Sequence, residues 1–440
     1  MMKTFRKVFL LSIIVLTLVN CKNETKEYDP EDWLNPDVPS LCDAYKDYFD
    51  YVGFAVEYGI KGWSETELAF SNVQQGLAKH ANTITMGNEF KPQFIMQWWG
   101  NNPTISGTFT ASNGLTINTP VLNGFGSVDA ILKICKDNNL KMRGHTLAWH
   151  SQTEEAFFRE DYESKKPLVS AKEMDARLEW YIKTVLEHVA TWEKDNNNGK
   201  HIIWAWDVFN EVTSDNSSAS AAISSNYSDW LRTSGSNWWN IYKNPDFVIH
   251  AFQYANKYAP DDVKLVYNDY GGAYGAKHQS QLRLTQLILD HQNDELPTRL
   301  DAMGLQSHYS VKVSDSTIEN EIKDFINQGL NVHITELDIG TCGNYNSKTD
   351  TVNASGKQFN SLAEAYKAYF KVYINNRKTA SKNGIENITI WGINDENTWL
   401  NSDDQKKWLD NCTQYPLLFT KSNDTYYTKP AFYAVIEAAK

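Results

Sequence analysis

Eight short apolar segments alternate with amphipathic stretches along this chain of 440 residues, and the alternation limits the folds open to it. The segments are rich in β-branched and aromatic residues, as strands are. They lie at residues 51–56, 82–86, 141–147, 202–209, 264–268, 302–306, 331–337 and 387–393. Strands that alternate with helices form parallel sheets, and eight of them favour an α/β fold, the closed (β/α)8 TIM barrel. A doubly wound open sheet usually has a glycine-rich phosphate loop after its first strand, and Gly53 stands in no such pattern.

One segment interrupts the alternation of strands and helices. Between the second strand and the helix expected near Ser127, apolar and small residues alternate over 104–119 around Asn113-Gly114. Asn-Gly between alternating runs is a strong hairpin signal because both residues tolerate positive φ. We therefore predict a single domain over residues 41–440, with an extra β-hairpin on the second βα loop.

The first 21 residues have the features of an export signal. A basic start precedes an apolar run over 8–19, which is too short to span a bilayer as a helix. The run ends in Leu18-Val19-Asn20-Cys21, which resembles the lipobox of bacterial lipoproteins, and a plain secretory peptide is the alternative. We expect a signal peptide over 1–21, a lipid anchor on Cys21 and a polar tether over 22–40. The protein would then be exported and lipid-anchored at the cell envelope or cell surface.

Composition excludes some partners and suggests others. Lysine plus arginine number 42 against 54 for aspartate plus glutamate, and the net charge of −12 argues against binding of nucleic acid. The 15 tryptophans suit a protein that stacks rings against sugars. No pair among the cysteines after Cys21 has the spacing of metal ligands, so we expect no metal site. An exported chain could oxidise Cys342 with Cys412, which the sequence leaves open.

Polar residues with catalytic chemistry follow the predicted strands, at the end where barrel active sites form. Glu211 ends the fourth strand and Glu336 the seventh, with Asp338 two residues beyond on the same face. Charges of one sign that converge in a barrel mouth cost stability and therefore indicate function. His308 ends the neighbouring sixth strand, so we expect His308 and Asp338 to support an ionised Glu336. One protonated and one ionised carboxyl group suit glycoside hydrolysis.

Six motifs in chain order resemble those of glycoside hydrolase family 10. They are His145-Thr-Leu-Ala-Trp-His-Ser-Gln152, Trp206-Asp-Val-Phe-Asn-Glu211, Asn268-Asp-Tyr270, Gln306-Ser-His308, Ile334-Thr-Glu336-Leu-Asp338 and Trp391-Gly-Ile-Asn-Asp395 with Trp399. The resemblance covers nearly the whole chain after the tether, so residues 41–440 would form the catalytic domain. It implies a retaining endo-β-1,4-xylanase on a (β/α)8 barrel. Such an enzyme cleaves internal bonds of xylan through a covalent glycosyl-enzyme intermediate and needs no cofactor.

The resemblance also implies a role for each matching residue. Glu211 is similar to the family's acid/base and Glu336 to its nucleophile, while Asn210 would hold the 2-hydroxyl of the sugar being cleaved. Asn88 and Lys91 would bind the next sugar on the non-reducing, or glycone, side. The other implied substrate-binding residues are His145, Trp149, Gln152, Tyr270, Gln306, Trp391 and Trp399. Tyr270 among them would face the leaving-group side, and Trp391 and Trp399 would cover the sugars.

Gly87 departs from the family pattern, which usually has a glutamate directly before Asn88. The contact of that glutamate with sugar hydroxyls is therefore absent, and specificity on the glycone side is expected to change. Trp98, Trp99 and the hairpin over 104–119 follow the same strand, and we expect them to lie over the glycone side of the cleft. An indole stacked on a sugar would tolerate decorated xylose. The alternative is that both tryptophans pack the hairpin onto the barrel.

Two other functions are alternatives to a xylanase. A related retaining barrel endo-glucanase would share the two glutamates, whereas the His145–His150 motif and Lys91 favour xylan. A non-catalytic surface glycan-binding protein would not need His308 and Asp338 beside a pair of acids. The expected partners are xylan or xylo-oligosaccharides, and contact with a membrane is expected only through the lipid on Cys21.

Overall fold

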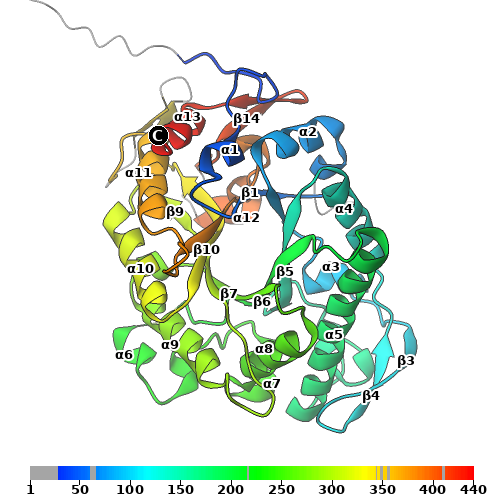
Figure 1. Ribbon diagram of the computed structural model, residues 1–440. Coiled ribbons are helices and arrows are strands. Elements are labelled where there is room, and N and C mark those ends of the chain that lie inside the picture. Colours follow the sequence, from blue (N-terminus) through cyan, green and yellow to red (C-terminus); the bar gives the residue numbers. More distant parts are fainter. Residues whose placement is uncertain are drawn as a thin grey trace, which may run out of the picture.

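The computed structural model describes residues 28–59, 66–215, 218–342, 344–346, 350–353, 357–408 and 412–440. Eight parallel strands form its centre, and helices surround them (Figure 1). The strands are β1 (Tyr51–Val56), β2 (Thr83–Met86), β5 (Lys141–Trp149), β6 (Ile203–Asn210), β7 (Lys264–Asp269), β8 (Ala302–Leu305), β10 (Asn331–Gly340) and β13 (Ile385–Ile390). Each strand pairs with the next in this order, and β13 pairs with both β10 and β1. The predicted closed barrel is confirmed, and every predicted strand is present with ends that differ by a few residues.

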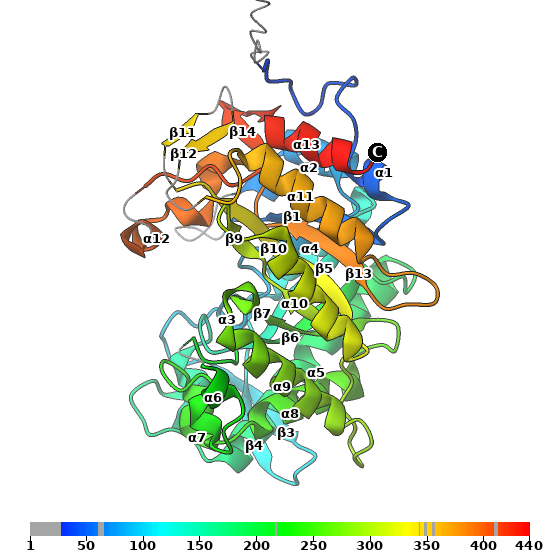
Figure 2. The ribbon, with the colours of Figure 1, turned by 90° about the vertical axis from the view of Figure 1, so that its left-hand side faces the viewer.

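Helices cover the outside of the barrel (Figures 1 and 2). They are α1 (Leu41–Tyr45), α2 (Ser71–His80), α3 (Pro92–Met96), α4 (Phe125–Asp137), α5 (Ala171–Asn196), α6 (Ala219–Ala222), α7 (Asn237–Tyr242), α8 (Asp246–Tyr258), α9 (Ala276–Asp290), α10 (Asp315–Asn327), α11 (Leu362–Asn375), α12 (Asp403–Trp408) and α13 (Pro430–Ala438). Ser170, Ser314 and Ser361 cap α5, α10 and α11 by accepting a backbone N–H of the first turn. Among the helices in the described ranges, none has the length and apolarity that a membrane span requires.

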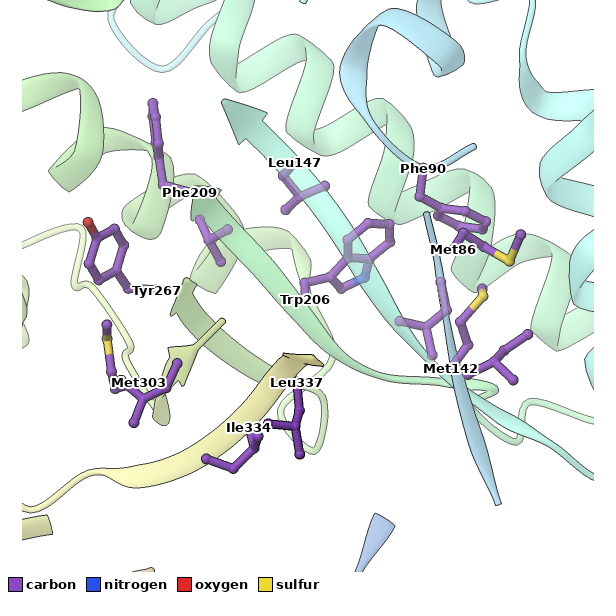
Figure 3. Packing of buried hydrophobic residues seen from close by; sticks show 14 of the residues in the cluster. Met86, Phe90, Met142, Leu147, Trp206, Phe209, Tyr267, Met303, Ile334 and Leu337 are labelled. Atoms are coloured by element: carbon purple, nitrogen blue, oxygen red, sulfur yellow. The ribbon is translucent and has the colours of Figure 1, made fainter. Parts of the chain in front are cut away.

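Large apolar side chains fill the space between the sheet and its helices. Figure 3 shows Trp206 of β6 with Phe90, Met142 and Leu147 around it. Trp206 is 1% exposed, and its ring centroid lies 5.9 Å from that of Phe90. A Cβ on Gly144 of the neighbouring strand would lie 2.2 Å from the indole, so only glycine leaves room for it. This tryptophan therefore belongs to the core, where close packing stabilises the barrel.

The pairing of β5 and β6 is irregular near their carboxyl ends. The register between them shifts between His145 and Ala148, and the register of β6 with β7 shifts between Asp207 and Phe209. Such irregularities bend a strand and change the direction of the side chains that follow. They precede Glu211 and thus help to set the direction of its carboxyl group.

The predicted hairpin is present as β3 (Ile105–Thr110) and β4 (Thr116–Pro120), which pair around Asn113-Gly114. Its tip is attached to α5 by Glu179, which accepts hydrogen bonds from the backbone N and the hydroxyl of Ser112 at 2.7 and 2.5 Å. Lys257 of α8 donates to the same buried carboxylate at 2.9 Å. The hairpin tip therefore packs on the outer helices, and Figure 1 shows β3 and β4 beside α5.

This position corrects the expectation that the hairpin lies over the glycone side of the cleft. Trp98 is 3% exposed and donates from its indole N–H to the carbonyl of Val121 at 2.8 Å. It therefore packs the hairpin onto the barrel. Trp99 is 39% exposed, and its backbone N donates to Glu154 at 2.7 Å. The expectation was wrong because the hairpin tip is held by Glu179 of α5, which Lys257 of α8 also contacts. Both helices are distant from the hairpin in sequence.

The segment before α1 corrects a second expectation. Residues 28–40 were expected to belong to a polar tether, but Trp33 within them is 1% exposed. Its ring lies 5.8 Å from that of His80 and 4.7 Å from that of Tyr426, measured between centroids. Burial of the indole removes apolar surface from water and so stabilises the packing of this segment on the barrel. Residues 1–27, with the predicted signal peptide, Cys21 and the start of the tether, lie outside the described residues.

Short strands and a disulfide lie outside the ring of eight strands. The short strands are β9 (His308–Ser310), β11 (Asn344–Asn346), β12 (Thr351–Asn353), β14 (Phe419–Ser422) and β15 (Thr425–Thr428). Cys342 after β10 is bonded to Cys412 after α12, with their Cα atoms 5.7 Å apart. The pairing that the sequence left open is therefore formed, and it joins the loop after β10 to the loop region after β13.

Glu321 of α10 predicts a pH dependence of stability. It is 5% exposed and accepts a hydrogen bond from the hydroxyl of Tyr309 at 3.2 Å. Burial raises the pKa of Glu321 from 4.5 to about 8. The folded state thus holds this proton more tightly than the unfolded chain, so the contribution to stability present at low pH is lost as pH rises through about 8. At about 1.4 kcal/mol per pKa unit, the loss is on the order of 5 kcal/mol.

We expect Glu321→Gln to remove this term, so that the thermal midpoint of the variant falls less than that of the wild type between pH 5 and pH 8.5 (roughly the interval that the shift spans). Differential scanning calorimetry at several pH values measures it. Glu295→Gln, at an exposed position, is the matched control and should follow the wild type. Parallel curves for wild type and Glu321→Gln would contradict the prediction.

Candidate active site

The predicted site residues gather at the carboxyl end of the barrel. Helices α3, α6 and α12, which follow β2, β6 and β13, lie at this end, on the left of Figure 2. Glu211 directly follows β6, and Glu336 lies within β10. Gln152, Glu211 and Ser307 at this end have φ values of 41°, 58° and 59°. Left-handed backbone costs energy for residues other than glycine and is concentrated at functional sites.

Glu211 is held by two donors, and its surroundings raise its pKa. Its Oε2 accepts from Trp149 Nε1 and its Oε1 from Gln306 Nε2, both at 2.9 Å. Burial raises the pKa of Glu211, and the negative charges of Asp269 and Glu336 raise it further, against the lowering effect of the Gln306 hydrogen bond. Glu211 therefore keeps its proton to a higher pH than an ordinary glutamate, as an acid catalyst must.

His150 is the nearest imidazole to Glu211, with its Nδ1 3.9 Å from Oε2. Burial lowers the pKa of His150 to about 3, and the charge of Arg232 lowers it as well. This ring is therefore neutral at ordinary pH, so it does not favour ionisation of Glu211 as a nearby cation would. His150 was part of a predicted motif, but its role beside Glu211 did not follow from the sequence.

Glu336 has the opposite environment. Its Oε1 accepts from Asn268 Nδ2 at 2.8 Å, and its Oε2 lies 3.3 Å from His308 Nε2. Burial alone raises the pKa of Glu336, but the hydrogen bond from His308, the charges of His145 and His308 and the bond from Asn268 outweigh it and lower the pKa. Glu336 is therefore ionised, as a nucleophile must be.

His308 lies between Glu336 and Asp338. Its Nδ1 is 3.0 Å from Asp338 Oδ2, so the ring contacts one carboxylate with each nitrogen. Burial by itself lowers the pKa of His308, but Asp338 and Glu336 together raise it to about 10. The imidazole is thus a cation at neutral pH, and this charge is the main reason that Glu336 stays ionised.

Asn268 at the end of β7 orients two of the predicted residues, although no role follows for it from the sequence. Its Nδ2 donates to Asn210 Oδ1 at 2.9 Å and to Glu336 Oε1 at 2.8 Å. Its Oδ1 accepts from Thr335 Oγ1 at 2.7 Å, which fixes the amide orientation. Gln306 Nε2 lies 3.3 Å from the same Asn210 oxygen. In the sequence, the one sign of a role for Asn268 was its position at the start of the Asn268-Asp-Tyr270 motif.

His145 is supported by a buried ion pair that the sequence did not identify. Its Nδ1 lies 2.9 Å from Asp207 Oδ2, and Asp207 Oδ1 accepts from Arg143 Nη2 at 2.5 Å. Burial raises the pKa of Asp207, but Arg143 and His145 outweigh that effect and lower it. An ionised acceptor beside Nδ1 places a proton on that nitrogen and fixes the orientation of the ring. A charged Arg143 inside a strand was the signal available in the sequence.

Asn88, Lys91 and Gln152 form one hydrogen-bonded group on the β2 side of the acids. Lys91 Nζ donates to Asn88 Oδ1 at 3.2 Å and to Gln152 Oε1 at 2.9 Å, and Gln152 Nε2 donates to Asn88 Oδ1 at 3.2 Å. The Lys91 ammonium lies 5.1 Å from the centroid of the Trp149 ring. Burial lowers the pKa of Lys91, while the charges of Glu336 and Glu57 act in the opposite direction.

Trp391 and Trp399 line a pocket of about 690 Å³ at the ends of β1, β2 and β13. Trp399 Nε1 donates to Asp338 Oδ2 at 2.8 Å, and its ring lies 4.9 Å from that of His308. The Trp391 ring packs edge-on against His145 at 5.6 Å. The two indoles thus connect the pocket to the acids, and their faces can stack on sugar rings.

Tyr270 is the predicted residue that is held in a separate cluster. Its hydroxyl donates to Asp215 Oδ1 at 2.6 Å and accepts from Arg232 Nη2 at 3.0 Å, and Lys277 Nζ lies 3.4 Å from its ring centroid. Arg232 also donates from Nε to the backbone oxygen of Glu211 at 3.0 Å. Tyr270 is therefore linked to the acids through Arg232, from the β7 side of the barrel.

Two carboxyl groups with opposite pKa shifts thus lie at one barrel mouth. A protonated and an ionised carboxyl group together can protonate a leaving oxygen and attack the carbon that bears it. Over the residues that the structure describes, no three His, Cys, Asp or Glu side chains are placed to hold a metal ion.

Comparisons with known proteins agree with this geometry. The model of glycosyl hydrolase family 10 matches residues 40–438. Endo-1,4-beta-xylanase Y of Acetivibrio thermocellus is 31% identical over 400 residues, which is 90% of this chain and 32% of that protein. A putative endo-1,4-beta-xylanase of Caldicellulosiruptor saccharolyticus is 33% identical over 330 residues, 71% of this chain and 89% of that protein. This chain spans between about a third and about half of the first two curated relatives it matches.

A solved structure has the same architecture. The CBM22-1–GH10 modules of Clostridium thermocellum endo-1,4-beta-D-xylanase 10B, complexed with xylohexaose, match with a TM-score of 0.69 and 30% identity. The match covers 91% of this chain and 68% of that one. A family model that spans the barrel, together with the acids directly after β6 and within β10, identifies the family. The chain belongs to glycosyl hydrolase family 10.

Proposed function

We propose that this chain is a retaining endo-β-1,4-xylanase that cleaves internal β-1,4-xylosidic bonds of xylan. The observation that carries the proposal is the opposite pKa shift of Glu211 and Glu336 within a family 10 barrel. The relatives named above, which are described as endo-1,4-beta-xylanases, support xylan as the substrate. The polar group around Lys91 and the indoles of Trp391 and Trp399 supply hydroxyl contacts and stacking faces for a chain of sugars.

In the first step, the Glu336 carboxylate attacks the anomeric carbon and forms a C–O bond to it. The bond from that carbon to the leaving oxygen breaks, and this oxygen takes the proton of Glu211. In the second step, water attacks the same carbon and gives a proton to Glu211, and Glu336 leaves as a carboxylate. Two displacements retain the configuration of the sugar. The His308 cation and the Asn268 amide hold Glu336 in position for both steps.

Release of reducing ends from linear xylan and from carboxymethyl-cellulose, assayed side by side, tests the proposed function. We expect release from xylan, with the β-anomer as the first product in proton NMR spectra. Greater release from carboxymethyl-cellulose would support the endo-glucanase alternative. Binding of xylan without release would support a glycan-binding protein, and an α-anomer as first product would exclude the retaining mechanism.

We further propose that the protein is exported and anchored by lipid on Cys21. The apolar run over 8–19 and the lipobox-like sequence that ends in Cys21 support the proposal. The Cys342–Cys412 disulfide supports an oxidising compartment, because such bonds persist outside the reducing cytosol. A surface location would keep xylo-oligosaccharide products near the cell.

Detergent partitioning measures the anchor directly. We expect the wild-type protein to enter the detergent phase and Cys21→Ala to remain in the aqueous phase, because one or more acyl chains dominate the affinity for an apolar phase. Cys42→Ala, which removes a thiol after the tether, is the matched control and should partition like the wild type. Equal aqueous partitioning of wild type and Cys21→Ala would favour a plain secretory peptide.

A further inference from the structure

Glu57, which follows β1, extends the polar group around Lys91 by one carboxylate. Its Oε1 accepts a hydrogen bond from Asn88 Nδ2 at 2.8 Å. The Oδ1 atom of the same Asn88 accepts from Lys91 and Gln152. A continuous chain of hydrogen bonds thus runs from Glu57 through Asn88 to Lys91 and Gln152, on the side of the acids where β1 and β2 end. Glu57 has no role in the mechanism described above.

Gly87 leaves the space that this carboxylate occupies. A Cβ on residue 87 would lie 2.9 Å from Glu57 Oε1 and 3.1 Å from its Cγ. A side chain at position 87 would crowd the Glu57 carboxylate and displace it, so the glycine leaves Glu57 the room that it occupies. A carboxylate beside Asn88 is thus supplied from β1, while the glutamate expected from β2 is replaced by glycine.

Glu57 and Gly87 also line the pocket of about 690 Å³ that contains Trp391 and Trp399. Glu57 is partly exposed, as a residue that contacts a ligand in this pocket must be. An ionised carboxylate accepts hydrogen bonds only, and hydroxyl groups are its natural neutral donors. Indole faces beside a carboxylate combine stacking with hydroxyl recognition, which is the chemistry that an uncharged sugar requires.

We propose that Glu57 is a substrate-binding residue, whose carboxylate accepts a hydrogen bond from a hydroxyl of the xylosyl unit next to the cleaved unit, on the glycone side. The proposal rests on the proposed xylanase function. The glycone side is assigned because Glu57 accepts a hydrogen bond from Asn88, for which the resemblance to family 10 implies a contact with that sugar. Because the recognised group is a hydroxyl and the residue is an anion, this position selects neutral xylosyl units over units that carry an acid.

The test compares two chromogenic substrates of the purified full chain. The 4-nitrophenyl β-xylobioside has a xylosyl unit beyond the cleaved one, and 4-nitrophenyl β-xyloside has none. We expect Glu57→Gln and Glu57→Ala to lower the ratio of kcat/KM for xylobioside to kcat/KM for xyloside about 10- to 100-fold, the range for one hydrogen bond to a charged group. Glu437→Gln, at a surface glutamate paired with Lys367, is the matched control and should keep the wild-type ratio.

The double variant Glu57→Ala/Gly87→Glu gives an independent check. Gly87→Glu alone should lower the ratio because the new side chain displaces the Glu57 carboxylate, and the double variant should recover at least part of it because a carboxylate returns from position 87. An unchanged ratio in both Glu57 variants, or an equal loss on both substrates, would overturn the proposal. A wild-type protein that cleaves neither these substrates nor xylan would instead contradict the proposed function, so the two failures are distinguishable.

Discussion

Replacement of Glu336 by alanine is expected to reduce kcat on xylan by about 10⁵- to 10⁶-fold, the range seen when a catalytic nucleophile is removed. The loss should extend to substrates with good leaving groups, because no covalent intermediate can form on any of them. Initial rates of reducing-end release and of nitrophenol release measure it. Glu295→Ala, at an exposed position, should keep wild-type rates.

Azide distinguishes the loss of a nucleophile from the loss of the fold. In the space left by Glu336, azide should attack the anomeric carbon in a single displacement and yield the α-xylosyl azide, with the configuration inverted. Proton NMR of the product shows its configuration. If azide instead gave the β-xylosyl azide, Glu336 would not be the nucleophile.

Replacement of Glu211 by alanine is expected to lower kcat on xylan by about 10²- to 10⁴-fold, the usual contribution of a general acid. On 4-nitrophenyl substrates the first step should be largely spared, because nitrophenolate leaves without a proton. The second step lacks its base, so the glycosyl-enzyme should accumulate and add the mass of the sugar to the intact protein. Mass spectrometry of the variant mixed with substrate detects it.

The pH profile gives a second measure of Glu211. Since burial and nearby negative charge raise the pKa of Glu211, wild-type kcat/KM on xylan should fall on the alkaline side as this proton is lost. The fall should be absent in Glu211→Ala assayed with 4-nitrophenyl substrates. Azide should rescue this variant and yield the β-xylosyl azide, the opposite of the product from Glu336→Ala. A persistent alkaline fall in the variant would assign that limb to another group.

The strands and their order could be predicted because their signal is local. Segments such as 51–56 and 331–337 are apolar and β-branched, and each becomes a strand of the barrel. In a barrel of parallel strands, the carboxyl ends of all strands lie at one end, so the meeting of Glu211 and Glu336 followed from their positions alone. The hairpin signal of Asn113-Gly114 was local as well, and β3 and β4 form around it.

Contacts between distant segments could not be predicted in this way. The burial of Trp33 depends on His80 and Tyr426, which lie far away in the chain, so a polar stretch that resembled a tether packs on the barrel. The hairpin tip lies on α5 because Glu179 accepts hydrogen bonds from it. In both cases the contacting residues are distant in the chain, so the local sequence of the segment does not predict the contact.

The sequence by itself determined the eight-stranded barrel, the strand ends that carry the acids, and the family motifs around them. Only the tertiary structure decided which groups set the charge of each acid, because those groups come from other strands. Asn268 and His308 approach Glu336, and Asp269 and Trp149 approach Glu211, only when the barrel closes. The place of the Glu57 carboxylate beside Asn88 was likewise decided there, because it depends on groups that neighbouring strands bring together.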